Sequence, residues 1–170
     1  ILRWTISNGV CPVSTDEVQI RLDQTPTGSN AGTDQVVCGT SATLGGNLPA
    51  IGTGVWTISA GAGGSVITPS SPTSPFTGVA GTTYTLTWTI SNGVCPVSTD
   101  DVQIQLDASP TVSSAGADQN ICGTSAVLGG NVPVTGTGLW SVVSGAGGSF
   151  VLNTNPVTTF NGVAGTTYLL

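Results

Sequence analysis

The stretch TYTLTWTISNGVCPVSTDDVQIQL, residues 83–106, decides the fold class of this protein. Two runs within it alternate between apolar and polar side chains. The apolar positions are Tyr84, Leu86, Trp88 and Ile90 in the first run and Val102, Ile104 and Leu106 in the second. A period of two is typical of strands that bury one face and expose the other in an antiparallel sheet. The stretch therefore predicts two strands whose apolar faces contribute to a core.

The dipeptide Asn92-Gly93 between the two runs favours a hairpin connection. A plain two-residue turn there would place the inward Leu86 opposite the outward Thr99. Because a shift of one residue moves every side chain to the other face, the connection must contain a bulge or a longer loop. The letters VCPVST, residues 94–99, supply the extra length.

Part of this stretch occurs twice in the chain. The thirteen residues WTISNGVCPVSTD run from Trp4 to Asp16 and again from Trp88 to Asp100, 84 positions later. With this offset, 55 of the 86 positions in residues 1–86 match residues 85–170. A fixed period indicates a repeated structural unit. The sequence begins and ends inside the same apolar stretch of that period, so we expect it to be a window of a longer array.

Each period contains seven short apolar runs separated by turn residues. In the first copy they are 31–39, 41–47, 54–59, 64–69, 74–79, 83–92 and 101–106. Their number and spacing predict an all-β fold of sandwich modules, without helices. Two Pro-containing links rich in Ser and Thr set the module boundaries. We expect residues 1–25 to be the last two strands of a preceding module, 26–109 a complete module, and 110–170 a following module that is incomplete at its C-terminal end.

The composition excludes some classes of partner. Charged residues make up 6% of the chain, and the net charge is −6. The two cations, Arg3 and Arg21, are too few to neutralise a phosphate backbone, which excludes nucleic acid. No run approaches the ~18 apolar residues of a membrane helix, so we expect no membrane segment in this window. With 38% apolar residues in regular alternation, a folded β protein is favoured over disorder.

Three segments of the sequence resemble a known family of repeats. They are AGTDQVVCGTSATLGGN (31–47), GTGVWTISAGAGG (52–64) and FTGVAGTTYTLTWTISNGVCPVSTDDVQI (76–104). These segments are similar to the PKD-like, immunoglobulin-like repeats of very large surface proteins that gliding Gram-negative bacteria secrete, usually through the type IX system. The resemblance implies tandem Ig-like sandwich modules in an extracellular adhesin or filament at the cell surface. It implies neighbouring modules or other copies as partners, and it carries over no catalytic residue.

One pair of cysteine positions recurs in each period. Because nothing about the chain is typical of a cytosolic protein, disulfides are favoured. Cys38 and Cys95 belong to one complete module, and we expect them to be bonded. Cys11 and Cys122 would then pair outside the window. Cys38 ends the first strand and Cys95 follows the penultimate one, so a bond to a neighbouring module and free thiols stay open as alternatives.

Four acidic residues are candidates for calcium ligands near the module ends: Asp34, Asp100, Asp101 and Asp118. No DxDxDG-type loop surrounds them, and we expect solvated acids and turn caps instead. Adjacent residues on a strand point to opposite faces, so Asp100 and Asp101 do not form the carboxylate pair of a glycosidase. No His is present to activate a nucleophile. We therefore expect no enzymatic activity and no cofactor.

The tryptophans favour a structural interpretation as well. Trp56 and its counterpart Trp140 fall where the third strand of a sandwich carries its core Trp, and Trp88 lies on an inward face. We expect a structural, non-catalytic repeat of an extracellular bacterial surface filament or adhesin stalk. The alternative is a carbohydrate- or ligand-binding module of a secreted adhesin or polysaccharide-degrading enzyme. A row of exposed aromatic side chains, equivalent in both copies, would favour that alternative.

Overall fold

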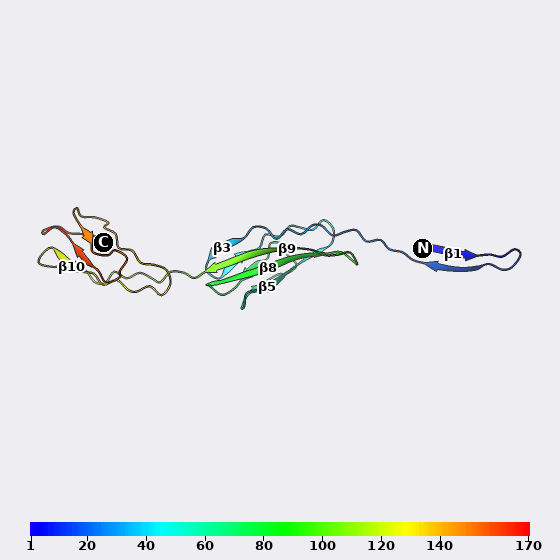
Figure 1. Ribbon diagram of the computed structural model, residues 1–170, viewed down its shortest axis with the longest axis horizontal. Coiled ribbons are helices and arrows are strands. Elements are labelled where there is room, and N and C mark those ends of the chain that lie inside the picture. The colour runs from blue at the N-terminus through cyan, green and yellow to red at the C-terminus, as the bar shows by residue number, and fades with distance from the viewer. The chain divides into compact units, whose positions relative to one another are not determined.

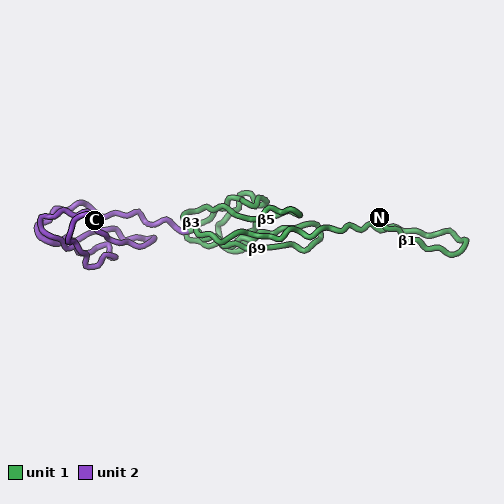
Figure 2. The backbone as a smooth tube through the Cα atoms, turned by 90° about the horizontal axis from the view of Figure 1, so that it is seen from above, with its two compact units in different colours: residues 1–106 green, residues 107–170 purple.

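The computed structural model describes residues 1–170, and all of its regular elements are β-strands. The all-β prediction is confirmed. No helix of a length and apolarity suited to a bilayer is present. The chain forms two compact units, Ile1–Leu106 and Asp107–Leu170 (Figure 2). In chain order the strands are β1 (Leu2–Ile6), β2 (Ser14–Val18), β3 (Gln35–Cys38), β4 (Ser41–Thr43), β5 (Thr53–Ala60), β6 (Ser65–Val66), β7 (Pro75–Thr77), β8 (Thr82–Ser91), β9 (Ser98–Asp107), β10 (Ser125–Val127), β11 (Ser149–Phe150) and β12 (Thr159–Asn161).

The larger sheet of the first unit has the strand order β3-β9-β8-β5 (Figure 1). Its centre is the antiparallel hairpin of β8 and β9, each ten residues long. Leu86 pairs with Val102, so inward positions face inward positions. Residues 92–97 connect the two strands, which confirms the longer loop predicted from the parity of the pairing.

A second sheet, with the order β4-β7-β6, completes a β-sandwich-like unit. Side chains from both sheets enter one core cluster. The rings of Phe76 on β7 and Tyr84 on β8 meet edge to face, with centroids 4.9 Å apart. Seven residues predicted for the core are at most 2% exposed: Trp56, Tyr84, Leu86, Trp88, Ile90, Val102 and Ile104.

Two glycines make room for the tryptophans of this core. A Cβ atom at Gly46 would lie 2.9 Å from Cζ2 of Trp56 and 3.2 Å from Cδ2 of Trp88. A Cβ atom at Gly54 would overlap the indole of Trp88. The absence of a side chain at both positions therefore lets the two indoles pack against the backbone.

The second unit contains one sheet, with the order β10-β12-β11. These strands lie 84 residues after β4, β7 and β6. Residues 137–144, which align with β5, form no strand and only one isolated bridge, Ser144 to Leu169. In the first unit β5 pairs along its length with β8, and the second unit has a counterpart only for the first residues of β8. A strand without a neighbour is not stable, which explains the missing element.

The hairpin of β1 and β2 repeats the pairing of β8 and β9. Leu2 pairs with Val18 and Trp4 with Asp16, as Leu86 pairs with Val102 and Trp88 with Asp100. Every residue of β1 and β2 is exposed, whereas the inward residues of β8 and β9 are buried.

Candidate functional site

The first and last segments of the sandwich run side by side in the same direction. Three hydrogen bonds join them, each between residues 69 positions apart: Ser29 N–H to Ser98 Oγ (2.8 Å), Ala31 N–H to Asp100 Oδ2 (2.7 Å) and Gln103 N–H to Asp34 Oδ1 (2.8 Å). A constant separation means that the two segments are parallel. The sandwich is therefore entered at one end of β9 and left at the other.

The entry point lies against the loop that connects β8 and β9. Asn92 Nδ2 donates to the carbonyl of Gln24 at 2.8 Å, and Cys95 Sγ donates to the carbonyl of Asp23 at 3.4 Å. The Asp23 side chain also accepts from Arg21 Nε at 2.7 Å. These contacts fix residues 23 and 24 at the loop end of the sandwich.

The cysteines lie at opposite ends of β9. Cys95 is at the loop end beside Asp23, whereas the separation of 69 brings Cys38 level with Asp107, the last residue of β9. Ten residues at about 3.3 Å each place those levels roughly 33 Å apart. A disulfide needs Cα atoms within about 7 Å. The structure contains no disulfide, and the expected bond between Cys38 and Cys95 is not formed.

Cys11 and Cys122 are exposed. Cys11 lies in the loop of the β1–β2 hairpin, and Cys122 precedes β10. In both cases the nearest regular strand is short, and neither thiol is part of a group of metal-ligating side chains.

Two of the calcium candidates bind backbone amides. Asp34 and Asp100 accept the hydrogen bonds that join the parallel segments, from Gln103 N–H and Ala31 N–H. Asp101 is exposed on β9, and Asp118 lines a hollow in the second unit. No three acidic, cysteine or histidine side chains gather into a group. The structure thus gives Asp34 and Asp100 a role in strand pairing that their spacing in the sequence did not reveal.

The aromatic side chains of the sandwich all face inward. They are Trp56, Phe76, Tyr84 and Trp88, each at most 2% exposed. No exposed aromatic row, the feature that would favour a sugar-binding surface, is present on residues 26–109. Trp140, expected in a core, is only half-buried.

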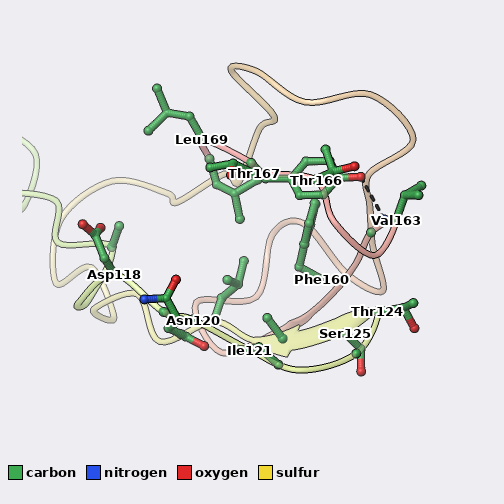
Figure 3. Close-up of a pocket in the computed structure, with 18 of the residues that line it drawn as sticks. Asp118, Asn120, Ile121, Thr124, Ser125, Phe160, Val163, Thr166, Thr167 and Leu169 are labelled. Atoms are coloured by element: carbon green, nitrogen blue, oxygen red, sulfur yellow. Dashed lines mark hydrogen bonds between the residues drawn. The ribbon is translucent and has the colours of Figure 1, made fainter.

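An open hollow of about 520 Å³ occupies the second unit beside Trp140 and Tyr168 (Figure 3). Ala115, Leu128 and Phe160 also line it. A second hollow of about 320 Å³ shares Ala115 and Trp140 with the first and reaches Gly138. Ala31, the counterpart of Ala115, is 1% exposed in the first unit, because the sandwich is closed there.

Local contacts of the two units agree away from the hollow. Tyr168 Oη accepts from Val163 N–H and donates to the carbonyl of Ala146, at 2.9 and 2.7 Å, as Tyr84 does with Val79 and Ala62. The second unit therefore differs from the first mainly where β8 and β9 would lie. No sequence pattern pointed to this surface, because it arises from missing partners.

A comparison with protein-family models and with curated proteins finds no match to this chain.

Proposed function

We propose that the chain is a structural part of an extracellular bacterial surface filament or adhesin stalk. In this proposal Ig-like sandwich modules follow one another every 84 residues and resist tension, without catalysis. The 84-residue repeat and the resemblance to PKD-like repeats of surface proteins support the tandem arrangement. The cell-surface location rests on that resemblance alone.

The parallel pairing of the terminal segments is the observation that carries the mechanical role. The chain enters the sandwich beside Asp23 and leaves it at Asp107, at opposite ends of β9. Tension on the two ends would slide residues 23–38 along residues 92–107. The hydrogen bonds between parallel segments would then bear the force together, whereas a hairpin pulled from one end opens one bond at a time. A sandwich loaded in this way suits a stalk.

The proposed function is tested by pulling the whole chain from its two ends in a single-molecule force experiment. Unfolding of the sandwich releases about 80 residues, which lengthens the chain by roughly 25 nm. Asp100→Ala removes the acceptor of Ala31 N–H and should lower the force of that event. Asp101→Ala is the matched control, because Asp101 is exposed and adjacent on the same strand. An event of that length that unfolds at the same force in both variants would argue against the mechanical role.

The binding alternative makes a different prediction. The sandwich buries all four of its aromatic rings, so no aromatic platform for a sugar is available on it. Glycan-array binding that survives in the intact chain would favour the alternative, and it would call for a surface built from polar side chains.

A further inference from the structure

The exposed hairpin carries the same inward residues as the buried one. Its six inward side chains are Leu2, Trp4, Ile6, Val18, Ile20 and Leu22, with exposed fractions between 55% and 89%. Their counterparts on the second copy are Leu86, Trp88, Ile90, Val102, Ile104 and Leu106, identical in type and at most 1% exposed. In residues 1–22 the two copies differ at Ile1, Arg3, Glu17 and Arg21, which all fall on the outward face.

The hairpin also has the register that a completed sandwich requires. Trp4 pairs with Asp16 as Trp88 pairs with Asp100, so the inward side chains are already aligned. An element that is ordered before it binds loses less conformational entropy on binding.

The second unit has an empty place of matching shape. In the first unit a Cβ atom at Gly54 would overlap the indole of Trp88, whereas nothing lies within 4 Å of such an atom at its counterpart Gly138. Likewise, Leu106 lies beside Gly78, but only Tyr168 lies beside the counterpart Gly162. The space that Trp88 and Leu106 fill in the first unit is therefore open in the second.

From these observations we infer that residues 1–22 of one copy of the chain dock into the open face of residues 107–170 of a second copy. The docked hairpin takes the place that β8 and β9 have in the first unit and adds its strands to the sheet edge. Trp4 of the incoming copy lies opposite Trp140, as Trp88 lies opposite Trp56.

The polar contacts of the closed sandwich find their partners too. Asp16 of the incoming copy accepts from Ala115 N–H, as Asp100 accepts from Ala31. Its Gln19 N–H donates to Asp118, as Gln103 does to Asp34. The indole N–H of Trp4 donates to the Asn131 carbonyl, as Trp88 Nε1 donates to Asn47 at 3.2 Å. Each of these residues is identical in the two copies, apart from no exception among the side chains that form the bonds.

The contact uses different surfaces on the two copies, so each copy offers one hairpin and one open face. Head-to-tail contacts of this kind extend into open chains unless a ring closes. The 84-residue repeat then continues across each junction. This inference deepens the proposed stalk function and depends on it only for its use in the cell.

The first test measures the mass of the intact chain in solution against concentration, by analytical ultracentrifugation. The wild-type chain should form oligomers that grow with concentration. Trp4→Ala should weaken the contact about 100-fold or more, because a buried Trp is replaced by a cavity. Val10→Ala is the matched control: Val10 is fully exposed and its counterpart Val94 is 90% exposed. This control should assemble like the wild type.

The second test blocks the other surface. Gly138→Val fills the place of the Trp4 indole while touching nothing in its own unit. Gly129→Ala is its control, because neither Gly129 nor its counterpart Gly45 has an atom within 4 Å of the added Cβ. The Trp4→Ala and Gly138→Val chains should each be monomeric. Their equimolar mixture should form a dimer and nothing larger, since only one hairpin and one open face remain functional.

A wild-type chain that stays monomeric would overturn the inference, and so would a mixture of the two blocked chains that does not dimerise. Oligomers that persist in Trp4→Ala would assign the association to another surface. None of these outcomes bears on the force at which the first unit unfolds. Failure of the docking and failure of the proposed function are therefore distinguishable.

Discussion

The indole rings of Trp56 and Trp88 lie with their centroids 5.0 Å apart and their planes inclined by 38°. Each ring N–H donates to a backbone carbonyl, that of Trp56 to Pro72 at 3.1 Å and that of Trp88 to Asn47 at 3.2 Å. The pair thus joins β5 and β8 to two loops, so its polar atoms are satisfied inside the core.

Trp88→Ala should lower the free energy of unfolding of the first unit by about 3–5 kcal/mol, because it leaves a large cavity in a closed core. Trp4→Ala removes the same residue from the same thirteen-letter segment, but its side chain is 72% exposed. That control should change the stability of the first unit by less than about 0.5 kcal/mol. Urea unfolding followed by near-ultraviolet circular dichroism measures both, and equal effects would contradict the burial difference.

Gly46→Ala should destabilise the first unit by about 1–3 kcal/mol, because the new methyl group is forced against Trp56 and Trp88. The neighbouring Gly45→Ala adds the same atom where nothing lies within 4 Å. Calorimetry of the two variants should show a lowered melting temperature for Gly46→Ala alone. A shift of similar size in both would mean that backbone flexibility, rather than contact with the indoles, decides the result.

Tyr84→Phe keeps the ring against Phe76 but removes two hydrogen bonds, from Val79 N–H at 2.8 Å and to the Ala62 carbonyl at 2.9 Å. We expect a loss of about 1–2 kcal/mol in the free energy of unfolding. The same substitution at Tyr168 should leave the first unit unchanged, since that residue makes its bonds within the second. Chemical denaturation of both variants distinguishes a hydrogen-bond effect from a general one.

Peptide mapping of the oxidised, non-reduced chain should yield no peptide that links Cys38 to Cys95. The two residues lie at opposite ends of β9, too far apart for a bond without unfolding. In a longer array, a bond from Cys38 should reach the cysteine that corresponds to Cys95 in the following module. A Cys38–Cys95 peptide from folded protein would show that the parallel pairing of the terminal segments is wrong.

Local alternation was enough to predict the strands of the first unit. Residues 83–92 and 101–106 were predicted as strands, and β8 and β9 begin and end within three residues of those bounds. The inward positions followed from the same period of two, because one buried face specifies it. The need for a long connection followed from the parity of Leu86 and Val102.

The relation of Cys38 to Cys95 could not be obtained in this way. It depends on whether residues 23–38 run parallel or antiparallel to β9, and alternation is the same for both directions. The roles of Asp34 and Asp100 depend on that direction as well, since each meets an amide 69 residues away. The half-burial of Trp140 reflects the absence of a neighbouring strand, which the surrounding letters do not encode.

The parallel pairing also imposes an order on folding. A chain made from its N-terminus presents residues 1–22 before β8 and β9 exist, with the same inward side chains. To replace them in its own first unit, this hairpin would have to run residues 8–23 beside residues 23–38 in the same direction. Parallel neighbours need a crossover of about a dozen residues or more, and here none intervenes. The short link thus prevents premature closure, and the nascent sandwich waits until its own last strand is synthesised.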